Sequence, residues 1–476
     1  MTVIMQSEPA IAPYRTGATP PVANAPWVVF AVASVAVFLV SIDSTVLYAA
    51  FGALRAAFPG ARAADLSWVL NAYTVVFAAL LVPAGRLADL YGRKRIFVTG
   101  VSIFLLASLA CGLSGSVLQL IGARALQAIG AALLMPASLA IVLAAFPASR
   151  RAIVVSLWGA VGGLAAALGP SIGSWVVDAW GWPWAFYINL PLGALSLWRG
   201  RHVLEESRNP ENAAPLDIVG VLLIIVGVGA IALGLVRTES LGWGSPLVIA
   251  CLAGGVLALA LFVVWAKHSK APAIDLSLFE NPTYRWVNLA TLSFGIAFAM
   301  MFFAFFIYMT NVWHYSLPSA GLAVTPGPLM VVPTAIVAGR FAARIGHKPL
   351  LVIGSLVYAM GGLWFYFVPG IEPHYASEWL PGLFLTGIGV GMVLPSLSGA
   401  AVSGLPANRF GIGSAVNQAV RQVGSVLGVA LTIVLVGQAA PTLHDFHSVY
   451  LCHIFLALLT AALCLRVETR PHRIAT

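Results

Sequence analysis

Asp43 is the residue in this sequence whose position points most directly to chemistry. It lies within a long apolar run, from Trp27 to Ala49. Burying an unpaired carboxylate in a bilayer costs several kcal/mol, so such residues are rare and typical of an ion or proton path. A low dielectric favours the neutral form of a carboxyl group, which allows it to bind and release a proton. The alternative is that Asp43 lies at the membrane interface and is simply hydrated.

Arg124 is the expected partner of Asp43. At 1.5 Å per residue, Asp43 lies about 24 Å along its helix from Trp27, and Arg124 lies about 9 Å beyond Leu118. If the two helices run in opposite directions, both side chains reach a similar depth in a hydrocarbon layer about 30 Å thick. A nearby guanidinium favours the charged carboxylate and opposes the effect of burial. A purely structural anchor is the alternative role for Arg124.

Long apolar segments must position these residues. The chain has 476 residues, of which 60% are hydrophobic and only 9% are charged. A soluble protein would have about a quarter of its residues charged, whereas repeated apolar runs of about 20 residues predict membrane helices. We predict an all-α polytopic membrane protein with fourteen spans, arranged as six, two and six. The spans are 27–49, 65–84, 96–113, 118–146, 152–177, 184–199, 216–236, 246–266, 286–311, 320–344, 350–368, 379–403, 411–437 and 449–465.

The basic residues give these spans a direction. Gly85 to Arg95 place four positive charges in a short loop between the second and third spans. Short basic loops stay in the cytoplasm, so this loop defines the inside, and an even number of spans puts both termini there. The net charge of +9 therefore indicates this topology and no nucleic-acid partner. Of the 25 Lys and Arg residues, 20 fall on the inner side, and the exceptions are Arg55, Arg62, Arg124, Arg237 and Arg421.

A weak internal repeat indicates two related halves. Gly339 to Lys348 follow the second span of the second half, as Gly85 to Lys94 follow that of the first, although Ala343 stands where the first copy has Asp89. Related halves with a path between them are the usual architecture of secondary transporters. We expect a disordered cytoplasmic tail, a six-helix bundle, a cytoplasmic linker with two extra helices, a second six-helix bundle and a short cytoplasmic tail, at 1–25, 26–202, 203–268, 269–466 and 467–476.

Other kinds of site and protein are disfavoured. We interpret Cys111, Cys251, Cys452 and Cys464 as buried hydrophobic residues, because they lie in apolar spans and form no C-x-x-C pair. His444, Asp445 and His447 resemble metal ligands in type only, and we place them in a solvated outer loop. No cofactor or metal is expected. An enzyme would need a convergent catalytic set, and a receptor a soluble output domain, and we recognise neither.

Several motifs resemble those of the major facilitator superfamily. The signature G-x-L-a-D-r-x-G-r-(K/R) of that family is matched by Gly85, Asp89, Gly92, Arg93 and Lys94. Further segments resemble the fourteen-span drug:proton antiporters of the EmrB/QacA type. They are Ile42–Val46 (L-D-x-T-(I/V)), Leu120–Ala131 with Arg124 and Gln127 (R-x-x-q-G), Gly169–Ser174 (G-P-x-x-G-G), Trp182–Pro191 (W-R-W-x-F-x-I-N-x-P), and Gly413–Gly424 of the thirteenth span.

The resemblance implies a monomeric protein of the bacterial inner membrane, with no enzymatic activity. It would use the proton gradient to export lipophilic, cationic drugs by alternating access. Aromatic faces, which attract organic cations, are abundant in the ninth predicted span. An exporter of one native metabolite or lipid is the alternative within transport. The expected partners are small lipophilic molecules, protons and the bilayer.

The resemblance also implies roles for individual residues. Asp43 would bind the proton and Arg124 would tune it. An acid paired with a basic neighbour at a helix terminus can latch the two halves on the cytoplasmic side. The gate would contain Gly85, Asp89, Gly92 and Arg93, and the hinge Gly169, Pro170 and Gly173. The candidate cavity-lining residues are Gln127, Asn417, Gln418 and Arg421, of which Arg421 could equally support helix packing.

Overall fold

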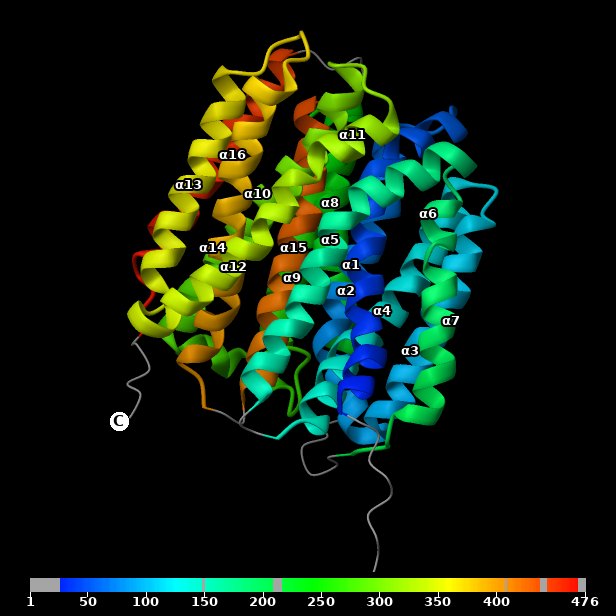
Figure 1. The fold of residues 1–476 in the computed structure, drawn as a ribbon, viewed down its shortest axis with the longest axis vertical. Coiled ribbons are helices and arrows are strands. Elements are labelled where there is room, and N and C mark those ends of the chain that lie inside the picture. The colour runs from blue at the N-terminus through cyan, green and yellow to red at the C-terminus, as the bar shows by residue number, and fades with distance from the viewer. Residues whose placement is uncertain (1–25, 148–149, 209–215, 407–408, 437–442, 470–476) are drawn as a thin grey trace, which may run out of the picture.

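The computed structural model describes residues 26–147, 150–208, 216–406, 409–436 and 443–469 (Figure 1). The predicted tail at 1–25 and most of the one at 467–476 lie outside this part. Regular structure in the described residues is helical. The first bundle contains α1 (Pro26–Ala57), α2 (Ala63–Tyr91), α3 (Arg93–Gly112), α4 (Val117–Ala145), α5 (Arg151–Trp180), α6 (Trp184–Tyr187) and α7 (Asn189–Val203).

Two further helices precede the second bundle, namely α8 (Ile218–Leu241) and α9 (Pro246–His268). The second bundle contains α10 (Pro282–Asn311), α11 (Leu317–Val324), α12 (Pro326–Ile345), α13 (Lys348–Phe367), α14 (Leu380–Ser403), α15 (Phe410–Val436) and α16 (Leu443–Cys464). Two short turns, η3 (Leu276–Glu280) and η4 (Tyr375–Trp379), precede α10 and α14. This confirms the all-α, polytopic fold class.

Thirteen helical segments in the described residues are long and apolar enough to cross a membrane. The remaining predicted span, 184–199, is formed by α6 and α7, which lie end to end beside α3 (Figure 1). Pro191 has no N–H to donate to the carbonyl of Tyr187, which removes one helical hydrogen bond where α6 ends and α7 begins. Pro326 separates α11 from α12 for the same reason, within the tenth predicted span.

The predicted loop at 85–95 is almost entirely helical. Helix α2 continues to Tyr91 and α3 begins at Arg93, so Gly92 alone separates them. Gly92 has φ +111°, a conformation that favours glycine, and a Cβ there would also displace the carboxylate of Glu206. The prediction of a short loop over all of 85–95 was wrong, because polar and charged residues continue a helix beyond the apolar run. We call this end of the molecule the basic end; α1 begins there and α16 finishes there (Figure 1).

Separate apolar cores hold the two bundles together. One joins buried side chains between Val29 and Leu204, and a larger one is built mainly from residues between Leu278 and Val467. A third core crosses between the bundles and brings Val46 of α1 together with Phe303 and Val429 of the second bundle. The main helix pairs that meet across this boundary are α2 with α15 and α5 with α11 and α12, and α1 also contacts α10.

The extra helices α8 and α9 pack on the seam between the bundles, where α8 contacts both α2 and α15. Asp217, which is 8% exposed, fixes this hairpin. Its carboxylate accepts hydrogen bonds from Gly220 N at 2.9 Å, Trp265 Nε1 at 2.8 Å and Ala273 N at 2.8 Å. One side chain therefore caps α8, holds α9 and orders the segment leading to α10.

We expect Asp217→Ala to lower the stability of the purified protein by about 1–3 kcal/mol, because three donors lose a buried charged acceptor. The measurement is the apparent melting temperature of the full chain in detergent. Asp178→Ala, at an exposed carboxylate near the end of α5, should leave it unchanged. Equal melting temperatures for wild type and Asp217→Ala would contradict this role.

Candidate functional site

Asp43 and Arg124 form a buried ion pair. Arg124 Nη1 donates to Asp43 Oδ2 at 2.6 Å, and each side chain is 1% exposed. Helix α1 packs against both α4 and α5, and Ala36 and Val46, on the same face of α1 as Asp43, are buried. The depth argument thus predicted a real contact, and hydration of Asp43 at an interface is excluded in this structure.

Two amides complete the coordination of Asp43. Its Oδ1 accepts from Gln127 Nε2 and from Asn189 Nδ2, both at 2.9 Å. Asn189 is fully buried and is the first residue of α7, at the break between α6 and α7. The interruption between α6 and α7 therefore places a polar side chain at membrane depth beside the acid, where a broken helix is tolerated because protein surrounds it.

Arg124 is held by further contacts besides the ion pair. Its Nε donates to Val69 O at 3.0 Å, and its Nη1 also donates to Gln127 Oε1. The guanidinium lies 4.1 Å from the ring centroid of Tyr73, a cation–π geometry. A buried charge that loses its partner costs about 3–5 kcal/mol. The contacts from α2 and α4 thus stabilise the buried guanidinium of Arg124.

The Asp43–Arg124 pair stabilises this conformation only while both groups are charged. With Asp43 ionised, the pair is neutral overall and its hydrogen bonds are satisfied. A proton on Asp43 would remove the attraction for Arg124 and leave a buried guanidinium without a counter-charge, so protonation disfavours this conformation.

The site contains residues whose roles the sequence did not reveal. Asn189 lies in the segment Trp182–Pro191 that carried part of the resemblance, but it had no assigned role; an Asn followed closely by Pro191 in an apolar run was its signal. Ser108 of α3 accepts from Gln127 Nε2 at 2.8 Å. Gln127, predicted to line a cavity, is 0% exposed and instead belongs to the Asp43 cluster.

The predicted gate residues lie together at the basic end. Arg93 Nη2 and Asp89 Oδ1 are 3.0 Å apart, across one helical turn of the α2–α3 junction. Their side chains are 23% and 33% exposed, and exposed pairs of this kind contribute about 0–1 kcal/mol. Gly85 packs against Pro136 of α4. All of these contacts are within the first bundle, so the latch between the halves stays a prediction.

At this end, Arg86 and Glu206 connect segments that are distant in the sequence. Arg86 Nη1 donates to Ala271 O at 3.1 Å, which joins α2 to the segment before the second bundle. The carboxylate of Glu206 accepts from Lys94 N at 3.1 Å and Arg95 N at 3.2 Å, which caps α3. A carboxylate was expected at this helix terminus, but it is Glu206 rather than Asp89 that occupies it.

The antiporter motif brings α5 close to α1. A Cβ at Gly169 would meet Thr45 Oγ1 at 1.9 Å, and one at Gly173 would meet Val46 Cγ1 at 2.8 Å. Pro170 lies inside α5, which runs unbroken past it. The motif thus permits a close helix–helix approach, and its role as a hinge remains a prediction.

The same turn of α5 closes the end opposite the basic end. Ser171 Oγ is hydrogen-bonded to Thr325 Oγ1, and a Cβ at Gly321 would lie 2.5 Å from Pro170 O. Ser174, which replaces a glycine of the motif, is tolerated because its Oγ donates to Pro170 O. Helix α5 of the first bundle and helix α11 of the second therefore pack here with their backbones close together.

The three candidates on α15 are divided between two environments. Asn417 is 4% exposed and donates to Asn288 Oδ1 at 3.1 Å and Thr291 Oγ1 at 2.8 Å, which fixes α15 to α10. Gln418 and Arg421 are half-buried, and Arg421 Nε donates to Gln418 Oε1 at 3.2 Å. Asn417 therefore supports packing, whereas the other two retain an accessible surface.

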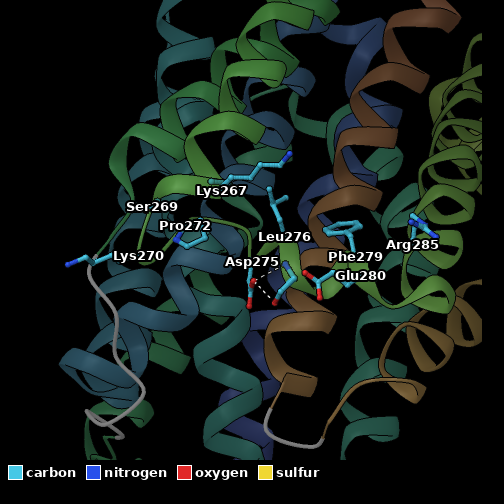
Figure 2. A pocket seen from close by; sticks show the side chains of 11 residues that line it. Lys267, Ser269, Lys270, Pro272, Asp275, Leu276, Phe279, Glu280 and Arg285 are labelled. Atoms are coloured by element: carbon cyan, nitrogen blue, oxygen red, sulfur yellow. Dashed lines mark hydrogen bonds between the residues drawn. The ribbon is translucent and has the colours of Figure 1, made fainter.

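A separate cavity of about 630 Å³ lies at the basic end, between the end of α9 and the start of α10. Figure 2 shows Lys267, Lys270 and Arg285 pointing away from one another, with Asp275 and Glu280 between them. Mixed charges that do not converge on one point do not form a site for a single ligand group. The cavity shares no lining residue with the Asp43 cluster, and we assign it no role.

Comparisons with known proteins agree with this geometry. The family model described as "Major Facilitator Superfamily" matches residues 33–429, and again residues 287–475. The multidrug resistance protein Stp of Mycobacterium tuberculosis is 34% identical over 395 residues, covering 83% of this chain and 73% of Stp. The tetracenomycin C resistance and export protein of Streptomyces glaucescens is 30% identical, covering 86% of this chain and 76% of its own.

Solved transporters have the same fold. A D-xylose–proton symporter superposes with a TM-score of 0.67 at 13% sequence identity, covering 94% of this chain and 99% of its own. Together with the helices long enough to span a bilayer, the bacterial relatives indicate a multi-pass protein of the inner membrane. The chain belongs to the major facilitator superfamily, a family of membrane transporters rather than enzymes.

Proposed function

We propose that this protein exports lipophilic compounds across the inner membrane in exchange for protons. The observation that carries the proposal is the buried Asp43–Arg124 pair, held by Gln127 and Asn189. The names of its relatives, among them multidrug resistance and antibiotic export proteins, support drug efflux. We further propose that the basic end and both termini face the cytoplasm.

In this mechanism the present structure is one of two alternating states. Helices α5 and α11 touch at the end opposite the basic end, through Ser171, Thr325 and Gly321, so that end is closed. Entry of a proton from the outside requires these helices to separate. Protonation of Asp43 weakens its bond to Arg124 and so stabilises the separated state. After α5 and α11 come together again, release of that proton to the cytoplasm restores the Asp43–Arg124 pair.

The proposal is tested with purified protein in liposomes under an imposed pH gradient. We expect uphill movement of a lipophilic fluorescent compound, with a simultaneous proton flux in the opposite direction, abolished by a protonophore. Uphill movement that persists without a proton gradient would contradict the coupling. Proton flux confined to one compound in a broad panel would favour the alternative, an exporter of one native metabolite or lipid.

The cationic preference implied by the family resemblance stays a prediction, and the charge inventory sharpens it. Asp43 is the only described acid more than three residues from an end of its span, and Arg124 already neutralises it. We therefore expect neutral and monovalent compounds to be exported at least about tenfold better than matched dications, whose second charge has no buried partner. Equal kcat/KM for a monocation and a dication on one scaffold would contradict this expectation.

A further inference from the structure

We infer that the transport path has a docking point for one acidic group of the substrate, formed by Arg421, beside an aromatic wall for its apolar body. The compound class this fits is an amphiphilic monoanion, such as an aromatic carboxylate, in place of the cations that the family resemblance implies. The inference rests on the proposed function and deepens it by naming a substrate class for the same path.

The first observation is an unpaired cation at membrane depth. Arg421 lies nine residues after the start of its span at Ile412. Among the described residues, no carboxylate lies within 4.0 Å of its guanidinium, and its two Nη groups have no hydrogen-bond partner. Because Asp43 and Arg124 cancel each other, the deep charge of the described spans is positive. A substrate anion is the partner that would compensate it.

The second observation is that Arg421 belongs to a polar stripe along α15. The stripe has the helical spacing i, i+4, i+7 and i+11, and none of its members is buried: it consists of Ser414, Gln418, Arg421 and Ser425. A membrane helix that keeps one polar, accessible face lines a water-filled path, because the same face against lipid would cost several kcal/mol.

The neighbours of α15 place this stripe toward the interior. On one side Gly424 packs on the backbone of α10, where a Cβ would lie 2.8 Å from Leu292 O. On the other side Val426 is buried with Val75 of α2 and Val221 of α8. The back of α15, including Val416, is buried in the core of the second bundle. The polar stripe therefore opens between α10 and α2, at the boundary of the two bundles.

An aromatic wall lies on the adjacent helix. A Cβ at Gly295 of α10 would be 2.8 Å from Arg421 O, and Phe298 follows Gly295 by about 4.5 Å of helix rise. The half-buried ring of Phe298 stacks on Phe302 at 5.9 Å, and Phe302 meets Tyr48 of α1 at 5.6 Å. An apolar surface from both bundles thus begins on the helix that packs against the backbone of Arg421, as an amphiphilic anion requires.

The test uses one pyrene scaffold carrying a carboxylate, a carboxamide or a trimethylammonium group. Binding is measured by pyrene fluorescence in detergent and transport in liposomes. Wild type should prefer the carboxylate at least about tenfold over the carboxamide, because a charge-assisted pair is lost. Arg421→Gln should reduce carboxylate binding to the carboxamide level, and Arg421→Glu should reverse the preference toward the ammonium. Gln422→Leu, at a half-buried neighbour, should retain the wild-type order.

Reversal by Arg421→Glu is a gain that misfolding cannot produce, and carboxamide export by each variant checks that the protein folds. Equal carboxylate binding by wild type and Arg421→Gln would overturn the inference. If the carboxamide moves with protons while no compound shows a charge preference, this inference fails and the proposed function survives. If the carboxylate binds as expected but no compound moves with protons, the proposed coupling fails instead.

The net charge moved in each transport cycle tests the same inference independently of the variants. One proton entering and one carboxylate leaving carry two positive charges inward, whereas exchange of one proton for one monocation carries none. Carboxylate export should therefore accelerate when the cytoplasmic side is made electrically negative. Export of the carboxylate that does not respond to the membrane potential would contradict a monoanion exchanged for a proton.

Discussion

Replacing Asp43 by Asn should reduce proton-driven export by at least about 100-fold while the protein still inserts and purifies. The amide has the same shape and can accept from Asn189 or Gln127, but it cannot bind and release a proton. It also leaves Arg124 charged with no counter-ion, a state that costs about 3–5 kcal/mol when buried. The measurement is uphill export and proton flux in liposomes, for which a 100-fold loss corresponds to about 2.7 kcal/mol.

Two controls separate loss of coupling from loss of fold. Asp178→Asn removes an exposed carboxylate near the end of α5 and should transport like wild type. The double variant Asp43→Asn with Arg124→Gln removes both charges, so it should regain the melting temperature lost by Asp43→Asn alone without regaining proton coupling. Retention of substrate–proton exchange in Asp43→Asn would remove this residue from the mechanism.

Replacing Gly321 by Leu should arrest transport at a defined step. In the closed state a Cβ at this position would lie 2.2 Å from Ser174 Oγ and 2.5 Å from Pro170 O. The hydroxyl can rotate but the backbone carbonyl cannot, so α5 and α11 must separate. If overpacking costs about 3 kcal/mol, the closed state loses about 100-fold in population. Uphill export should fall by a similar factor, because the cycle can no longer pass through this state.

A cysteine at Thr325 reports the position of the block. Thr325 is 9% exposed and lies in the closed contact, so an impermeant thiol reagent should label Thr325→Cys slowly in the wild-type background. The additional change Gly321→Leu should make labelling fast. Gly254→Leu, at an exposed glycine of α9 with open space around its Cα, should affect neither transport nor labelling. Slow labelling of Thr325→Cys with Gly321→Leu would exclude separation of α5 and α11.

The sequence was sufficient for the helices and for the central pair. Apolar runs long enough to cross a bilayer dictate helices, because every backbone polar group must be satisfied internally there. Opposite charges at similar depth in two spans are costly unless they meet, and the 2.6 Å contact between Asp43 and Arg124 follows from that constraint. Helix boundaries were less predictable, as at 85–95, because polar residues beyond the bilayer can continue a helix.

The sequence by itself determined which segments are buried in lipid and which charges need a partner. Both follow from the free-energy cost of placing each type of residue in a bilayer. Tertiary structure alone decided which partners lie within reach, because side chains from distant segments are brought together by packing. It added Asn189 to Asp43, assigned Gln127 and Asn417 to packed clusters, and left Arg421 on an accessible stripe. These residues have similar polarity in the sequence, and only the orientation of each helix against its neighbours distinguishes them.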